Sequence, residues 1–138
     1  MKWAALIAWV VTAGGGFVLL SIWLARGGMR QMGGKRIRPP LILTHFLLAA
    51  TGLVLWIIYL ANDSDTLAWV AFALLLVVAL LGFTMLAIWL SQRQPGGAGG
   101  SERPAEQNFP VPIVVLHGLL AATTLVLVFL TAVGVGGS

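Results

Sequence analysis

Four long apolar runs without a charged side chain dominate the sequence, and they leave few folds open to it. The runs cover roughly residues 3–25, 40–60, 67–91 and 112–134. A helix needs about 20 consecutive apolar residues to cross the hydrocarbon core of a bilayer, and each run is long enough. Because only short connections remain within 138 residues, the sequence predicts one all-α integral membrane domain over residues 1–138 with four transmembrane helices.

The composition excludes a soluble globular enzyme. Hydrophobic residues make up 59% of the chain and charged residues only 9%, whereas charged residues make up about a quarter of a soluble domain. The chain has no cysteine, which excludes disulfides, thiolate-ligated iron–sulfur clusters and covalently attached haem. A cofactor would need other ligands.

The charged residues are divided between the connections according to their sign. Lys2 stands apart, and the other seven cations lie in two connections: Arg26, Arg30, Lys35, Arg36, Arg38, Arg93 and Arg103. The positive-inside rule therefore places both basic connections in the cytoplasm, and it places the acidic turn at 62–65 and both termini outside a bacterial-type cytoplasmic membrane. Nucleic acid is not expected as a partner, because no aromatic residues interrupt the basic run.

Two other segments have a predicted role. The first run is a retained span and not a signal peptide, because it is too long and its positive charge follows it. Residues 92–109 are rich in Gly and Ser and are expected to form a flexible cytoplasmic linker that contains the acids Glu102 and Glu106.

The aromatic residues are expected to mark the membrane boundaries. Trp and Tyr favour the interface between lipid and water. Trp23 and Trp89 are assigned to the cytoplasmic boundary, and four residues to the outer one: Trp3, Trp56, Tyr59 and Trp69. Trp9 lies deeper in its run and is expected to pack against another helix.

The chain contains an internal repeat. A shift of 66 residues superposes the first run on the third, including Trp3 on Trp69 and Gly16-Phe17 on Gly82-Phe83. A shift of 72 residues superposes the second run on the fourth, with ten identities in the sixteen positions 40–55. These matches predict two tandem helical hairpins in the same orientation, over residues 1–61 and 67–134, in a four-helix bundle.

The only two histidines are equivalent within this repeat. His45 and His117 each follow a proline by five residues, which places them at the same depth in the second and fourth helices. In an up-down-up-down bundle these helices are diagonal, so the two imidazoles can face each other and bind the iron of haem b. Two imidazoles are too few for an ordinary zinc site.

The neighbouring residues suit a flat cofactor. Small residues three to seven positions beyond each histidine leave room beside the imidazoles, and Arg38 can pair with a haem propionate. The candidate cofactor-binding residues are His45, Ala49, Gly52, His117, Ala121, Thr124 and Arg38, with the two histidines also as metal ligands. Two histidines on facing helices of a four-helix bundle make the arrangement similar to small membrane cytochromes b, and that similarity covers only a residue pair and a topology.

Two functions stay open. The first is an accessory or scaffold subunit that packs against other membrane proteins or against copies of itself, because a neutral histidine can also serve helix packing. The alternative is a b-type haem electron carrier, since an ionisable residue at membrane depth is a functional candidate. Catalytic activity is not expected, because no acid lies in a span and no Ser–His–acid group can form at one depth.

Overall fold

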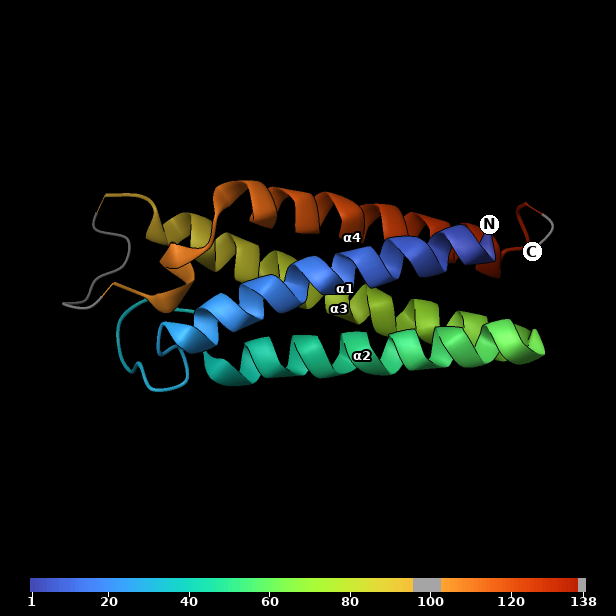
Figure 1. Cartoon of the computed structure of the whole chain (residues 1–138), viewed down its shortest axis with the longest axis horizontal. Coiled ribbons are helices and arrows are strands. Elements are labelled where there is room, and N and C mark those ends of the chain that lie inside the picture. The colour runs from blue at the N-terminus through green and yellow to red at the C-terminus, as the bar shows by residue number, and fades with distance from the viewer. Residues whose placement is uncertain (96–102, 137–138) are drawn as a thin grey trace.

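The computed structural model describes residues 1–95 and 103–136, which form four long helices and one short one (Figure 1). The helices are α1 (Lys2–Ala25), α2 (Pro39–Asn62), α3 (Asp65–Gln92), the 3-10 helix η1 (Ala105–Asn108) and α4 (Val111–Ala132). No strand occurs in these residues, and all four α-helices are long and apolar enough to cross a membrane. The predicted all-helical chain with four candidate spans is confirmed.

The helix ends follow from local residues. Pro39 and Pro40 open the first turn of α2, where a missing N–H costs nothing. The helix ends where Asp63 adopts a left-handed conformation with φ of 51°. Asp65 then opens α3, and its negative charge complements the helix dipole there. Because the turn between α2 and α3 is so short, these helices must lie antiparallel and adjacent.

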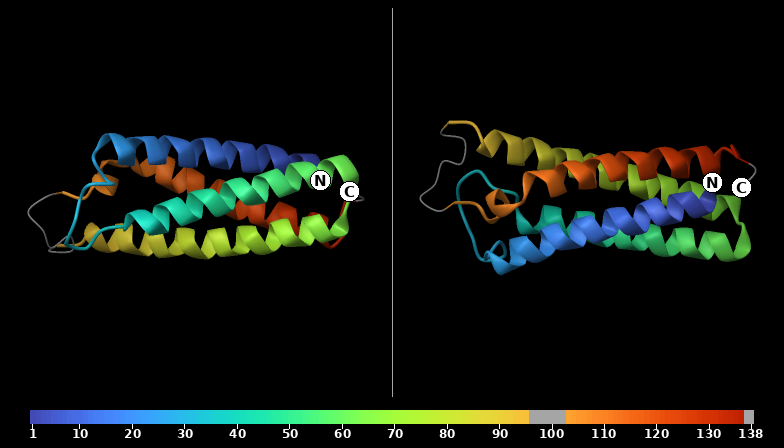
Figure 2. Two further views of the ribbon diagram at one scale, coloured as in Figure 1. Left: turned by 90° about the horizontal axis from the view of Figure 1, so that it is seen from below. Right: turned by 45° about the horizontal axis from the view of Figure 1, so that its top comes forward.

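The four helices form a ring in chain order, as two views of the bundle show (Figure 2). The most extensive packing joins α2 to α3 and α1 to α4, while α1 packs much less against α2. The long connection 26–38 allows α1 and α2 to separate, unlike the short turn before α3. Since α2 and α4 make no direct backbone approach, they are diagonal in the ring.

The core consists of two separate hydrophobic clusters. The larger one, in the half of the bundle that holds the termini, contains Ala5, Trp9, Trp56, Tyr59, Ala68, Ala71, Leu75, Val78 and Val128. The smaller one, at the other end, contains Trp23, Ile37, Ile42, Trp89 and Ala105. Along α2, Ile42 belongs to the smaller cluster and Leu48 packs on the larger one. His45 therefore lies between the clusters.

Several tryptophans lie inside the bundle and not at its outer surface. Trp23 is 1% exposed and Trp56 is fully buried, whereas Trp3 is 59% exposed. The buried indoles find acceptors within the chain: Trp89 Nε1 donates to the carbonyl of Glu106 at 2.9 Å, and Trp56 Nε1 donates to that of Lys2 at 3.2 Å. The expected boundary role thus fits Trp3 better than the buried tryptophans, while Trp9 packs in the core as expected.

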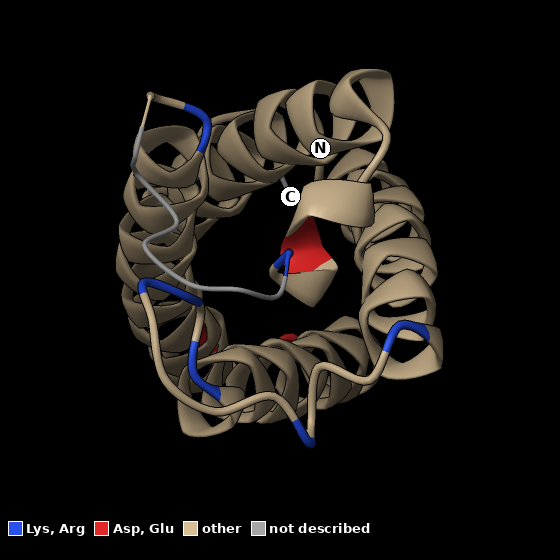
Figure 3. Ribbon diagram, turned by 90° about the vertical axis from the view of Figure 1, so that its left-hand side faces the viewer, with Lys and Arg blue, Asp and Glu red and all other residues tan. Residues whose placement is uncertain are grey.

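Charges separate to the two ends of the bundle. The basic end, seen in Figure 3, carries seven cations: Arg26, Arg30, Lys35, Arg36, Arg38, Arg93 and Arg103. At the opposite end Lys2 Nζ lies 2.5 Å from Asp63 Oδ1, the only ion pair among residues 1–95 and 103–136. No charged side chain lies between Lys2 and Arg26 on α1, which matches the pattern read from the sequence.

The connection before α4 differs from the predicted linker. Of residues 92–109, the segment 96–102 lies outside the described residues, but η1 folds into the ring of helices at the basic end (Figure 3). Glu106 is only 1% exposed there, and its Oε1 accepts hydrogen bonds from Ile37 N and Gln92 Nε2, each at 2.7 Å. Glu106 is therefore a buried structural residue and not the solvated loop acid that the sequence suggested.

Candidate functional site

The candidate site is the histidine pair between the two core clusters. His45 is six residues into α2 and His117 six residues into α4, which places each about 9 Å from the start of its helix. The two helices start at the same end of the bundle, so the histidines share one depth. The structure brings their rings together across the diagonal, with ring centroids 6.4 Å apart and planes inclined at 68°.

Both imidazoles are held by a backbone carbonyl of a neighbouring helix. His45 Nδ1 donates to the carbonyl of Val78 on α3 at 3.0 Å. His117 Nδ1 donates to the carbonyl of Thr12 on α1 at 2.9 Å. A carbonyl can only accept, so Nδ1 carries the proton of the neutral ring and Nε2 keeps its lone pair. This is the arrangement in which protein histidines bind metals.

A glycine exposes each of these carbonyls. Thr12 and Gly16 are four residues apart on α1, as Val78 and Gly82 are on α3, so each glycine lies one turn beyond the accepting carbonyl. A Cβ at Gly16 would lie 2.8 Å from His117 Cε1, and a Cβ at Gly82 would lie 3.2 Å from His45 Cε1. Only glycine lets the imidazoles lie this close to the neighbouring backbones.

The separation of the rings suits a shared metal centre. A metal bound to two imidazole nitrogens at about 2 Å each would place the nitrogens about 4 Å apart and the ring centroids roughly 6 Å apart. The observed centroid distance is 6.4 Å. No group of three or more His, Asp or Glu side chains lies close enough to hold an ion in residues 1–95 and 103–136. The pair therefore suits a centre that supplies its own remaining ligands.

The other residues predicted to surround a cofactor lie in different places. A Cβ at Gly52 would lie 2.9 Å from Trp9 Cζ2, so the indole of Trp9 occupies the space beside that glycine. Thr124 is fully buried, and its hydroxyl lies 3.1 Å from that of Thr12. Ala49 packs against the larger core cluster, and Ala121 is half-buried one turn beyond His117.

Arg38 lies at the basic end, outside the bundle. It precedes the first residue of α2 and is exposed to solvent. Seven residues separate it from His45, which corresponds to about 10 Å along the helix axis. No hydrogen bond joins its side chain to another described residue, so the structure leaves its guanidinium available to a ligand.

The sequence analysis did not assign Gly16 and Gly82 to the site, although a signal was present. The two glycines superpose in the internal repeat, each followed by a phenylalanine. A glycine in the middle of a helix costs about 1 kcal/mol relative to alanine, so a glycine that recurs at equivalent positions needs a local reason. The contact with an imidazole supplies that reason.

Comparison with known proteins does not extend the assignment. No protein-family model, curated protein or solved structure matches the chain. The functional argument therefore rests on the geometry of the chain itself.

Proposed function

We propose that the chain is an integral membrane protein whose basic end faces the cytoplasm. Large apolar side chains are exposed along every helix, including Ile7, Phe17, Phe83 and Leu119, each more than half exposed. Such a surface is unfavourable in water and ordinary in lipid. The gathering of seven cations at one end supports this orientation, with both termini outside.

The bundle would consist of two hairpins related by a pseudo-two-fold axis along the membrane normal. The contacts of the histidines support this: the bond from His45 to Val78 has its equivalent in the bond from His117 to Thr12, at the same shifts of 72 and 66 residues as in the sequence. The closest packing also pairs equivalent helices, α1 with α4 and α3 with α2.

Within this bundle, His45 and His117 bind haem b, and the protein carries electrons. The observation that carries this proposal is that both Nδ1 atoms donate to backbone carbonyls while the rings lie 6.4 Å apart, which directs two unprotonated nitrogens to one centre. Haem supplies its own equatorial nitrogens and one-electron chemistry, so two axial imidazoles suffice. Gly16 and Gly82 keep the flanking helices free of side chains at this level.

A reduced-minus-oxidised absorption spectrum tests the proposal. The protein is expressed with added haem precursor and purified in detergent, and we expect the bands of a low-spin b-type haem. His45→Ala and His117→Ala should each remove the low-spin spectrum, because each leaves one axial position without its ligand.

Matched control variants are available on the same helices. Thr51→Ala and Thr123→Ala change exposed hydroxyls that bond only to their own helix, so both should keep the wild-type spectrum. A correctly folded, helical preparation without a haem band would refute the haem proposal. A low-spin spectrum that persists in either histidine variant would refute the pairing.

A second candidate function is that of an accessory subunit or homo-oligomer. Gly14 on α1 and Gly118 on α4 are exposed, and a Cβ at either would meet no atom within 4 Å. Packing within the chain therefore does not require them, whereas small residues let a partner helix approach closely in a membrane. Gly14→Leu and Gly118→Leu should dissociate such a complex in cross-linking experiments, and unchanged cross-linking would argue against this contact.

A further inference from the structure

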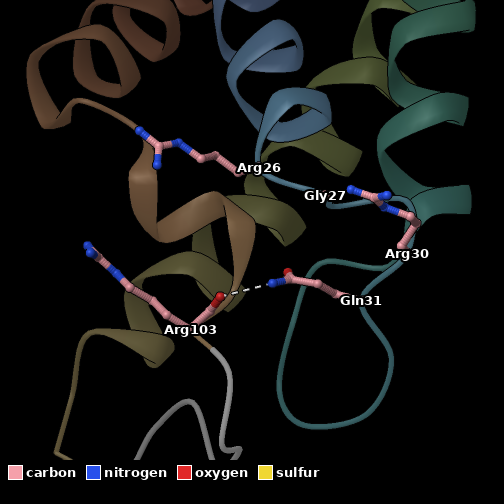
Figure 4. A pocket seen from close by; sticks show the side chains of 5 residues that line it. All are labelled: Arg26, Gly27, Arg30, Gln31 and Arg103. Atoms are coloured by element: carbon pink, nitrogen blue, oxygen red, sulfur yellow. Dashed lines mark hydrogen bonds between the residues drawn. The ribbon is translucent and has the colours of Figure 1, made fainter.

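An arginine-lined hollow at the basic end lies apart from the histidine pair. It has a volume of about 490 Å³ and is lined by Arg26, Gly27, Arg30, Gln31 and Arg103 (Figure 4). Gly16 faces the histidines, and Arg26 lies ten residues further along α1, about 15 Å toward the basic end. The hollow and the histidine pair are therefore separate sites.

Two segments distant in sequence build this hollow. Arg26 and Arg30 lie on the turn that ends α1, where Gly27 has a φ of 79°. The Gln31 side chain holds the second segment: its Nε2 donates to the carbonyl of Arg103 at 3.0 Å, and its Oε1 accepts from Ala105 N at 2.8 Å. Figure 4 shows Gln31 joined to Arg103 across the hollow. Gln31 thus holds a third arginine beside the other two.

The three guanidinium groups form an uncompensated positive site. Arginine stays charged at any physiological pH, and the three charges repel one another. Among the described carboxylates, none lies within ion-pair distance of Arg26, Arg30 or Arg103, because the one ion pair there joins Lys2 to Asp63. An anion with several oxygens would relieve this repulsion and accept hydrogen bonds from more than one guanidinium.

We propose that this hollow binds the phosphate group of an anionic phospholipid. The site lies where α1 leaves the apolar part of the bundle, which is the level of lipid headgroups if the protein spans a membrane as proposed. Leu24 and Met29, on either side of Arg26 in the chain, are each 49% exposed and offer an apolar surface to the acyl chains. The inference rests on membrane insertion and not on haem binding.

Lipid titration of the detergent-purified protein tests the inference. Native mass spectrometry measures the lipid-bound fraction with phosphatidylglycerol, with phosphatidylcholine and with inorganic phosphate. We expect preferential binding of phosphatidylglycerol. Arg26→Gln/Arg30→Gln should weaken it roughly 25-fold, since each cation at an anionic lipid surface contributes about fivefold.

Control variants separate the site from the general charge of this end. Lys35→Gln/Arg93→Gln removes the same charge from two exposed residues outside the hollow and should change binding much less. Gln31→Ala keeps every charge but releases the segment that carries Arg103, so it should weaken binding.

Three outcomes would overturn the proposal. Equal loss in both charge variants would indicate a diffuse electrostatic effect. Full competition by inorganic phosphate would assign the hollow to a soluble phosphate compound, and no preference between the lipids would exclude a specific site. The haem spectrum of the arginine variants should stay unchanged, so failure here is distinguishable from failure of the haem proposal.

Discussion

At the scale of single residues, two glycines decide whether the histidines can reach their acceptors. Gly16 and Gly82 leave the carbonyls of Thr12 and Val78 uncovered, and each imidazole lies against the glycine itself. The cost of a helical glycine is thereby offset by a hydrogen bond that orients the ring. The two contacts are not equally tight, and this difference can be measured.

We expect Gly16→Ala to disturb the site more than Gly82→Ala. The new Cβ would lie 2.8 Å from His117 Cε1 in the first variant and 3.2 Å from His45 Cε1 in the second. Overpacking costs about 1–3 kcal/mol and the gain in helix propensity is about 1 kcal/mol, so the first variant should be destabilised and the second nearly neutral. Thermal unfolding in detergent measures both.

The control is Gly14→Ala, where the added methyl meets open space. Its propensity gain should raise the unfolding midpoint slightly. Destabilisation of the same size in all three variants would show that the imidazole contacts are not the cause.

At the scale of elements, the short helix η1 closes the basic end of the bundle. Glu106 joins it to the backbone of Ile37 and to the side chain of Gln92, and Trp89 donates to the Glu106 carbonyl. A second amide, that of Gln107, donates to Gln92 Oε1 at 2.7 Å. The connection before α4 thus contributes a network of polar contacts to the core at that end.

We expect Glu106→Ala to destabilise the protein by about 2 kcal/mol, because a buried donor without an acceptor costs about 1–3 kcal/mol. Glu106→Gln keeps an acceptor oxygen for Ile37 N and should cost less. Hydrogen exchange at the Ile37 amide, together with denaturant unfolding, measures the effect. Asp65→Ala, at an exposed acid, is the control. Equal effects at both positions would contradict the proposed role of Glu106.

At the scale of the whole molecule, the separation of charge defines the two ends of the bundle. Seven cations gather at one end, while Lys2, Asp63 and Asp65 lie at the other. The proposed orientation places the first group in the cytoplasm, because anionic lipid and the membrane potential both favour cations on that side.

Cysteine labelling tests this orientation without interference, since the chain has no cysteine of its own. In intact cells, Ser64→Cys should react with an impermeant thiol reagent and Met32→Cys should not. Met32 is 89% exposed, so only the membrane would protect it. After permeabilisation both variants should react. The reverse pattern in intact cells would invert the proposed orientation.

Much of the molecule follows from periodicity and composition alone. The runs without charge predict the four helices to within about two residues at most ends, because helix formation in an apolar run depends on local residues. The equal depth of His45 and His117 follows from their spacing after the prolines. The distance between their rings does not, because it depends on how each helix is rotated about its axis.

The sequence alone therefore determined that the chain is helical, how many apolar spans it has and where its scarce polar residues lie along them. Only the tertiary structure decided that Trp23, Trp56 and Trp89 are buried, that η1 closes one end, and that Gly16 and Gly82 receive the imidazoles. The physical reason is range. Helix formation is settled within a few turns of chain, whereas helix rotation and packing depend on contacts between segments more than 60 residues apart, as between Ile37 and Glu106.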